Sequence, residues 1–439
     1  MTIRMDEGAA ELLDTLHRAG YAAYVVGGCV RDSLLGLTPH DWDLCTSALP
    51  QQVMELFGAQ RCIPTGLQHG TVTVKQSGAL YEITTFRTEG TYTDGRHPDE
   101  VHFVPDVRED LARRDLTINA MAYNEKEGLV DPFGGQADLQ SGIVRAVGVP
   151  RQRFTEDALR ILRLYRFAAR FGFAIDPPTA QAAQELCAHL DCVSVERIEE
   201  ELAKLLSAPA PAAYLNEKIL SVVLPELSPE ALAAAKPVVD VCPAGAENLP
   251  VRLAALLLSL GEDGIRRTLK RLRCSNALIE EAAVLVREAR GCDGSFLFGH
   301  DSGHSLARPI AFGNRVPPQR TVLRETTVTP GFTIYARRLL GRYNLCTVQR
   351  IAALGTALQP EHAADFAALS ELAEQLDADG VCCRVSQLAV NGRDLMAAGV
   401  PAGPGIRKVL EALLDGVIRE EYPNERQALL AAVQQLAAS

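Results

Sequence analysis

The spacing of apolar and polar positions changes character after about the first 140 residues. Up to that point, short runs of β-branched and aromatic residues are separated by glycine, proline and other turn residues, which is typical of an α/β segment. From Thr155 onward a 3.6-residue period dominates, so helices are expected almost throughout, and strands are expected to stop after about Val147. In the first part we predict strands at Tyr21–Val26, Asp41–Cys45, Gly70–Lys75 and Leu80–Phe86, and short helices at Val30–Leu35 and from Pro50 to Phe57.

Length and composition favour a globular protein of several domains that is not embedded in a membrane. The chain has 439 residues, of which 47% are hydrophobic and 23% are charged. At about 150 residues per domain, this length predicts about three domains. The longest apolar run, Leu253–Leu258, is far shorter than the ~20 residues that cross a bilayer. Eleven cysteines without a CxxC motif indicate reduced thiols, and we therefore expect a cytoplasmic protein.

The formal net charge of −11 argues against a histone-like polycation. It does not exclude a nucleic-acid partner, because a local basic stripe can bind phosphates. Between Arg145 and Arg170 the chain holds seven arginines against two carboxylates, Glu156 and Asp157, which is a local balance of +5. We predict that this segment forms a basic stripe suited to RNA phosphates.

Asp41 and Asp43 are the first candidates for chemistry. On a strand, two residues one step apart leave the same face, with their Cβ atoms about 7 Å apart. Two like charges at this separation are unfavourable unless a cation lies between them. Carboxylate oxygens suit Mg²⁺, which takes the rest of its ligands from water and substrate phosphates. A lone DxD pair is more often a surface loop or a helix cap, so the context decides between the two interpretations.

The context is a Gly27-Gly28 turn and a short helix before the aspartate pair. Glycines permit close backbone approach to a phosphate, and the N-terminus of the following helix offers free N–H groups. Arg31 lies in the first turn of that helix. The segment GGCVRDSLLG, followed by DWDLCT, resembles the opening motif of the nucleotidyltransferases related to DNA polymerase beta. The resemblance is to the branch that holds tRNA CCA-adding enzymes and bacterial poly(A) polymerases.

Four further segments resemble motifs of that branch, in the same order and up to residue 206. They are Leu111–Tyr123 (LARRDLTINAMAY, with Leu116 where Phe is usual), Asp131–Gly135 (DPFGG), Glu156–Phe167 (EDALRILRLYRF) and Val195–Leu206 (VERIEEELAKLL). Near the end of the chain, Val390–Asp394 and Pro423–Glu425 look like the tail of the same enzymes.

The resemblance implies an α+β fold, with a polymerase-beta-like nucleotidyltransferase head followed by all-α neck, body and tail domains. We expect the head at residues 1–142 and a nucleotide-selecting neck at 143–208. A helical body at 209–334, with an irregular insertion at about 291–333, and a tRNA-binding helical tail at 335–439 complete the prediction.

The resemblance also assigns roles to individual residues. Asp41 and Asp43 would be the catalytic metal ligands and would hold two Mg²⁺ ions. Gly28 and Arg31 would contact the triphosphate, and Arg114 the sugar or the phosphates. Arg163 and Arg166 would bind phosphates of the nucleotide or of tRNA. Glu82 is either an additional active-site carboxylate or an ordinary glutamate on the surface of a strand.

Asp157 and Arg160 are the candidates for nucleotide selection. Three residues apart on one predicted helix, they would be neighbours on its surface. A carboxylate accepts from an exocyclic amine, and a guanidinium donates to a ring nitrogen. Cytosine and adenine offer this amine beside an unprotonated ring nitrogen, whereas uracil and guanine offer the reverse. The pair would therefore accept C and A and reject U and G. The alternative is an ordinary intrahelical salt bridge.

Three functions remain open at this stage. The first is template-independent addition of CCA to the 3′ end of tRNA from CTP and ATP with release of pyrophosphate. The segment Arg87–Asp110 favours it, because it looks like the complete loop with which CCA-adding relatives switch from C to A. The second is a bacterial poly(A) polymerase, whose relatives usually carry a basic C-terminal extension that this chain lacks. The third is a non-catalytic RNA-binding relative, against which the intact DxD argues.

Overall fold

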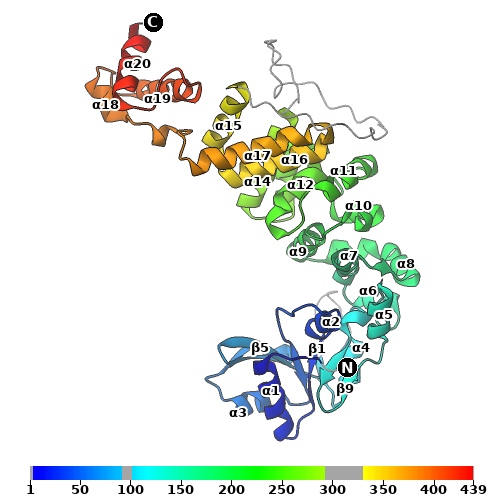
Figure 1. Ribbon diagram of the computed structural model, residues 1–439. Helices are drawn as coiled ribbons and strands as arrows, with labels where there is room; N and C mark the ends of the chain where they lie inside the picture. The colour runs from blue at the N-terminus through cyan, green and yellow to red at the C-terminus, as the bar shows by residue number, and fades with distance from the viewer. Residues whose placement is uncertain (1–2, 91–100, 292–329, 439) are drawn as a thin grey trace. The chain divides into compact units, whose positions relative to one another are not determined.

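The computed structural model describes residues 3–90, 101–291 and 330–438 (Figure 1). It divides into two compact units. The first comprises Met1–Pro229 with Arg271–Cys274, and the second comprises Glu230–Lys270 with Ser275–Ser439. The finer division into head, neck, body and tail at residues 142, 208 and 334 remains a prediction.

A seven-stranded mixed sheet forms the centre of the head (Figure 1). β2 and β5 run parallel, and the other neighbouring strands of this sheet are antiparallel. Its strands, in spatial order, are β3 (Cys62–Gly66), β4 (Thr71–Gln76), β5 (Ala79–Thr85), β2 (Leu44–Thr46), β1 (Ala23–Val26), β8 (Ala122–Asn124) and β9 (Gly128–Val130). A core cluster that includes Tyr24, Val26, Phe86, Leu111 and Ala122 packs against it.

Five helices accompany the sheet in the head: α1 (Glu7–Arg18), α2 (Gly28–Leu34), α3 (Pro50–Phe57), α4 (Val107–Ala112) and α5 (Gly135–Ser141). The β4–β5 hairpin closes through Ser77 and Gly78, whose φ angles of 51° and 85° are those of a turn with both central residues left-handed. The predicted strands at 70–75 and 80–86, the turn between them, and the helix ending at Phe57 are therefore confirmed.

The predicted strand Asp41–Cys45 is wrong in its position, because β2 spans only Leu44–Thr46. The sheet itself explains the difference. Val25 pairs with Leu44, and the Val26 N–H donates to the Asp43 carbonyl at 2.9 Å. The neighbouring strand then ends, because Gly27 has φ of 76° and the chain enters α2. The aspartate pair thus lies just before β2, at the end of the sheet where β1 turns into α2.

Two smaller sheets were not predicted. Strand β10 (Ile143–Val144) pairs in parallel with β11 (Ala174–Ile175), so strands do not stop at Val147. β6 (Arg87–Glu89) pairs antiparallel with β7 (Val101–Phe103). This hairpin holds the two described ends of the predicted loop Arg87–Asp110, of which residues 91–100 lie outside the described residues. Strands of two or three residues are too short to leave a periodic pattern.

The rest of the first unit is helical apart from β11. Helix α7 packs against α9 and against the strands β10 and β11. One predicted helix is divided in two, because α6 ends at Glu156 and α7 begins at Leu159. The helices are α6 (Pro150–Glu156), α7 (Leu159–Phe171), α8 (Pro177–Glu185), α9 (Val195–Leu206) and α10 (Glu217–Val223).

The second unit is built from helices throughout its described residues, as the periodicity predicts. No described helix is both long and apolar enough to span a bilayer. Its last part has a core of its own, which includes Leu395, Leu413 and Leu429. Most of the irregular segment predicted at about 291–333 lies outside the described residues. The helices are α11 (Pro229–Val241), α12 (Leu249–Leu257), α13 (Gly261–Arg271), α14 (Asn276–Gly291), α15 (Pro330–Arg342), α16 (Leu345–Leu358), α17 (Ala363–Ala378), α18 (Gly392–Ala397), α19 (Pro404–Ile418) and α20 (Arg426–Ala438).

Candidate active site

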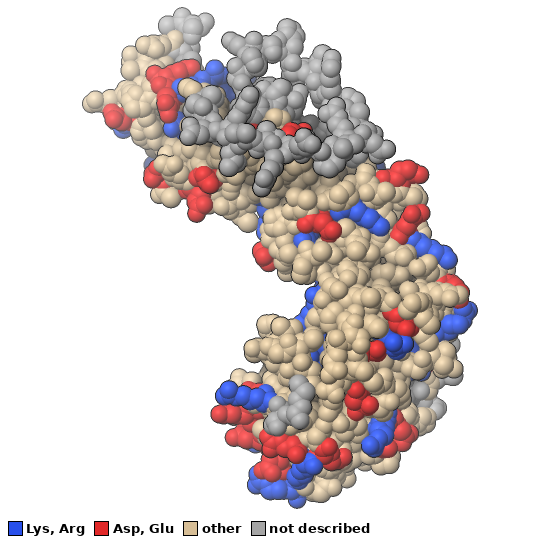
Figure 2. All heavy atoms as spheres, turned by 45° about the vertical axis from the view of Figure 1, so that its right-hand side comes forward, with Lys and Arg blue, Asp and Glu red and all other residues tan. Residues whose placement is uncertain are grey.

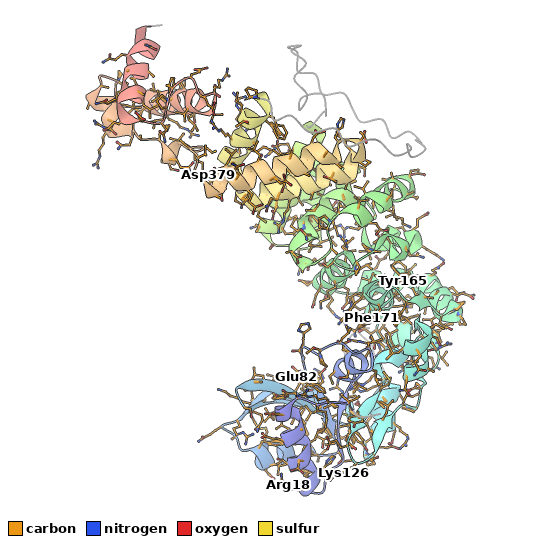
Figure 3. The ribbon with its side chains drawn as sticks, in the orientation of Figure 1. Arg18, Glu82, Lys126, Tyr165, Phe171 and Asp379 are labelled. Atoms are coloured by element: carbon orange, nitrogen blue, oxygen red, sulfur yellow. The ribbon has the colours of Figure 1, made fainter. Side chains whose placement is uncertain are left out.

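Three carboxylates approach one another at the end of β2. The parallel register pairs Leu44 with Ile83, and one step back along both strands Asp43 lies beside Glu82 of β5 (Figure 3). Both side chains are exposed to solvent, as is Asp41. Partial desolvation by the surrounding protein raises the pKa of Asp43. The positive charge of Arg114 opposes this rise, and the negative charges of Glu82 and Asp41 add to it.

This arrangement fits a divalent cation. The donors are hard carboxylate oxygens, and the effect of Glu82 and Asp41 on the pKa of Asp43 shows that their charges repel. Among the described residues, no group of three or more His, Cys, Asp or Glu side chains is close enough to form a complete metal cage. Mg²⁺ needs no such cage, because one or two carboxylates, water and substrate phosphates supply its ligands.

Gly27 and Arg114 form the side of the site next to the aspartates. A Cβ atom on Gly27 would lie 2.8 Å from Nη1 of Arg114, so the absence of a side chain at residue 27 gives the guanidinium its place. Arg114 donates to the carbonyl of Asn119 and to Asp110, both at 3.5 Å, and its buried Nε has no hydrogen-bond partner. The structure therefore brings Arg114 to the predicted metal site with donor capacity to spare.

Arg31 and Gly28 are neighbours, but the guanidinium of Arg31 points into the protein. A Cβ atom on Gly28 would lie 3.7 Å from Nη2 of Arg31. Arg31 is only 4% exposed. Its Nε donates to Asp32 at 2.7 Å, and its Nη1 donates to the side-chain oxygen of Asn119 at 2.6 Å. The predicted contact of Arg31 with a triphosphate remains a prediction.

Asp157 and Arg160 do not share a helix, which corrects the predicted geometry. Asp157 is the residue after α6, with φ −142° and ψ 105°. One of its carboxylate oxygens accepts from the N–H of Leu159 at 3.0 Å and so caps α7. Aspartate favours such a capping position over the interior of a helix. The other oxygen accepts from Arg197 of α9 at 2.7 Å.

Arg160 is held by a different carboxylate. Its Nη1 donates to Glu156 at 2.6 Å, and its Nη2 donates to the carbonyl of Arg113 at 3.0 Å. The intrahelical salt bridge between Asp157 and Arg160 that was the alternative interpretation is therefore not formed. Both side chains remain in one region with separate partners.

The seven arginines between residues 145 and 170 are each paired with a carboxylate. The prediction of a stripe with a net positive charge is therefore wrong, because acidic side chains from other segments balance it. Figure 2 shows basic and acidic atoms close together on one face of the molecule. The pairs are Arg145 with Asp138 and Asp176, Arg151 with Glu185, Arg153 and Arg160 with Glu156, Arg163 with Asp115 and Glu201, Arg166 with Glu201, and Arg170 with Asp32.

Asp115 is a residue of the site to which the sequence assigned no role. It is 8% exposed and accepts from Arg163 at 2.7 Å and from Asn119 at 3.2 Å. Burial by itself would raise the pKa of Asp115, but the charge and hydrogen bond of Arg163, together with Arg160 and Asn119, hold it well below its usual range. The RRDLTINA segment contained the signal, since it places an acid between two arginines and a later asparagine.

The DPFGG segment has a structural explanation. Asp131 accepts from the N–H groups of Gly135 and Gln136 at 2.7 and 2.8 Å, which caps the first turn of α5. A Cβ atom on Gly135 would lie 2.2 Å from the carbonyl oxygen of Thr117. Only glycine therefore allows α5 to pack this closely against the RRDLTINA segment.

Known proteins resemble the chain over nearly its whole length. The Poly A polymerase head domain model matches residues 23–145, the model of a probable RNA and SrmB-binding site of polymerase A matches residues 172–230, and a putative tRNA nucleotidyltransferase domain 2 matches residues 333–433. The CCA-adding enzyme of Lactiplantibacillus plantarum is 35% identical over 97% of this chain and 95% of its own. That of Limosilactobacillus fermentum is 37% identical over 98% and 97%.

Solved structures agree with this result. The Bacillus stearothermophilus CCA-adding enzyme in complex with CTP has a TM-score of 0.77 and 30% identity, and the match covers 99% of this chain and 98% of that one. The Thermotoga maritima CCA-adding enzyme complexed with tRNA, at 21% identity and a TM-score of 0.67 over 99% and 97% of the two chains, shares the fold.

The head and its site thus define a nucleotidyltransferase. With its full-length relatives, the chain belongs to the family of CCA-adding enzymes, the tRNA nucleotidyltransferases. The resemblance and the fold class inferred from the sequence are confirmed. The roles of individual site residues stay predictions.

Replacing Asp115 with asparagine should destabilise the protein in a pH-dependent way. The variant leaves Arg163 without its closest buried partner, at a cost of about 3 kcal/mol, which should lower the melting temperature at pH 7. Because the pKa of Asp115 is lower in the folded chain than in the unfolded one, its contribution is complete above about pH 5 and is lost as the pH falls below about 4. Melting curves between pH 7 and pH 3 should show the difference from wild type shrinking at acid pH.

Asp14→Asn is the matched control for that experiment. Asp14 forms an exposed ion pair with Arg18, and such pairs contribute little to stability. A pH-independent difference between wild type and Asp115→Asn would contradict the ionised state assigned to Asp115.

Proposed function

We propose that this protein adds CCA to the 3′ end of tRNA from CTP and ATP, releases pyrophosphate, and does so in the cytoplasm. The observation that carries the proposal is the assembly, within one compact unit, of the aspartate pair beside Glu82 and Arg114 and of Asp157 and Arg160 with separate partners. The full-length similarity to CCA-adding enzymes supports it. The ten described cysteines are all free, which supports a reducing compartment.

In the proposed reaction Asp41 and Asp43 hold the metal ions, with Glu82 as a candidate third carboxylate. Bound Mg²⁺ would lower the pKa of the attacking ribose hydroxyl and neutralise the triphosphate. Arg114 supplies a positive charge beside Asp43, together with a buried Nε that lacks a partner. Gly28 leaves room for the phosphates, and Arg31, Arg163 and Arg166 place positive charge behind them.

Nucleotide selection would follow from the donors and acceptors of Asp157 and Arg160. The carboxylate of Asp157 would accept from the amine of cytosine or adenine, while Arg160 would donate to the adjacent ring nitrogen. Uracil and guanine would leave both groups facing a like partner, which is costly in a buried site. The ion pairs to Arg197 and to Glu156 support this proposal, because they keep the two side chains from neutralising each other.

Incubating the purified protein with tRNA that lacks its 3′ end, and with each nucleotide separately and then CTP and ATP together, tests the proposal. We expect two C residues followed by one A, identified by sequencing the products. Long A tails on unrelated RNA would instead indicate a poly(A) polymerase, and binding without extension would indicate a non-catalytic relative. Asp41→Ala should lower incorporation about 1,000-fold, a loss of several kcal/mol of charge stabilisation, while tRNA binding remains measurable. Turnover close to wild type in this variant would exclude the metal role.

The double variant Asp157→Ala/Arg160→Ala should lose nucleotide selectivity. Without the acceptor and donor, UTP and GTP no longer meet unpaired polar groups, so their incorporation relative to CTP should rise at least about tenfold. Competition assays with mixed nucleotides measure this ratio. Glu200→Ala/Lys204→Ala removes an exposed pair on α9 and is the control. Unchanged ratios in the first variant would remove the selection proposal.

Deleting residues 91–100 should separate C addition from A addition. The deletion lies within the segment predicted to switch the site from C to A, so two C residues should still be added and the terminal A should be lost. The CC product is the internal control for folding and catalysis. If the shortened protein still completes CCA at the wild-type rate, the assignment of the loop is wrong.

A further inference from the structure

Two aromatic rings lie on the face of α7 that meets the head. Phe167 and Phe171 are one helical turn apart, and their rings are nearly parallel, with centroids 6.2 Å apart and an interplanar angle of 10°. Phe167 is buried, and Phe171, labelled in Figure 3, is half-buried. Neither residue has a polar group, so neither enters the proposed chemistry directly.

The guanidinium of Arg31 lies at the same distance from both rings. Its central carbon is 5.0 Å from the centroid of Phe167 and 5.1 Å from that of Phe171. Arg31 belongs to α2 of the head, directly after the Gly27-Gly28 turn. A cation over the face of an aromatic ring is attracted by the ring quadrupole, and the attraction is stronger where water is excluded. This contact therefore joins the phosphate side of the predicted site to α7.

Phe167 also contacts two arginines of its own helix. The central carbon of Arg163 lies 5.5 Å from the ring centroid, and that of Arg166 lies 3.9 Å from it. One ring is thus surrounded by three of the arginines predicted to bind the nucleotide or tRNA. Three guanidinium groups this close repel one another, and the carboxylates of Asp32, Asp115 and Glu201 offset that repulsion.

We propose that Phe167, supported by Phe171, is a positioning residue of the active site. Its ring fixes Arg31 of the head relative to Arg163 and Arg166 of α7. The proposal rests on the proposed function, in which the head holds the triphosphate at Asp41 and Asp43 while α7 and the residue before it select the base. One nucleotide must reach both places at once, and a displacement of about 1 Å between reacting groups is enough to reduce the rate strongly.

Phe167→Leu tests this role, because leucine keeps an apolar side chain but removes the aromatic face. With tRNA ending in the appropriate nucleotide, the KM for CTP and for ATP should each rise about tenfold, equal to about 1.4 kcal/mol, while kcat changes by less than about threefold. Phe167→Tyr retains the ring and should keep KM near the wild-type value. Phe57→Leu is the matched control: this buried ring lies 5.9 Å from Arg61, and Arg61 has no place in the proposed site.

A purely structural role of Phe167 gives a different result. In that case Phe167→Leu would lower the melting temperature as Phe57→Leu does and leave both KM values unchanged, which would overturn the proposal. Tyrosine that fails to rescue KM would overturn it as well. If Phe167→Leu does not fold, Phe171→Leu should raise KM severalfold through Arg31, and an unchanged KM in that variant would have the same force.

Equilibrium binding of CTP in the absence of tRNA separates this proposal from the proposed function. Wild type that binds CTP but adds no nucleotide to tRNA would contradict the proposed function. In that situation a weaker affinity of Phe167→Leu for CTP, restored by Phe167→Tyr, would still support the positioning role. Equal affinities of wild type and Phe167→Leu for CTP would contradict the positioning role while leaving CCA addition untouched.

Discussion

The interaction on which the site depends is the buried pairing of carboxylates with the arginines of α7. Asp115 binds Arg163, Glu201 binds Arg163 and Arg166, and Asp32 binds Arg31 and Arg170. Asp115 follows the two arginines of the RRDLTINA segment, Asp32 lies on α2, and Glu201 lies on α9. The helix is therefore fixed to the head on one side and to α9 on the other through charges. Removing one partner from a buried pair leaves an uncompensated charge, which is strongly unfavourable.

This pairing changes what the arginines can offer a ligand. Arginines that face only solvent would be mobile and would lose side-chain freedom on binding a phosphate. Here their positions are set in advance by carboxylates and by the ring of Phe167, so less freedom remains to be lost. The price is a smaller net positive charge, since each guanidinium shares its field with an acid. The structure thus favours geometry over bare charge, as phosphoryl transfer requires.

The sequence predicted the parts of the site that depend on local order along the chain. Gly27, Gly28, Asp41 and Asp43 follow one another within a strand–turn–helix–strand pattern, and the structure keeps that order with β2 displaced to Leu44–Thr46. The sequence could not predict which distant acid each arginine meets. Arg163 and Asp115 are 48 residues apart, and Arg197 and Asp157 are 40 apart. Such pairs depend on how the helices pack, and periodicity carries no information about that.

The break between α6 and α7 is the clearest example of tertiary structure prevailing over local pattern. A continuous helix through EDALR would place Asp157 and Arg160 side by side, and their pairing would gain only about 0.2–0.5 kcal/mol. In the structure Asp157 instead caps α7 and binds Arg197, while Arg160 binds Glu156. Two charge-assisted bonds and a helix cap outweigh one surface pair. In the proposed function the same break is what leaves an acceptor and a donor apart, each held by its own counter-charge, so that a base edge can lie between them.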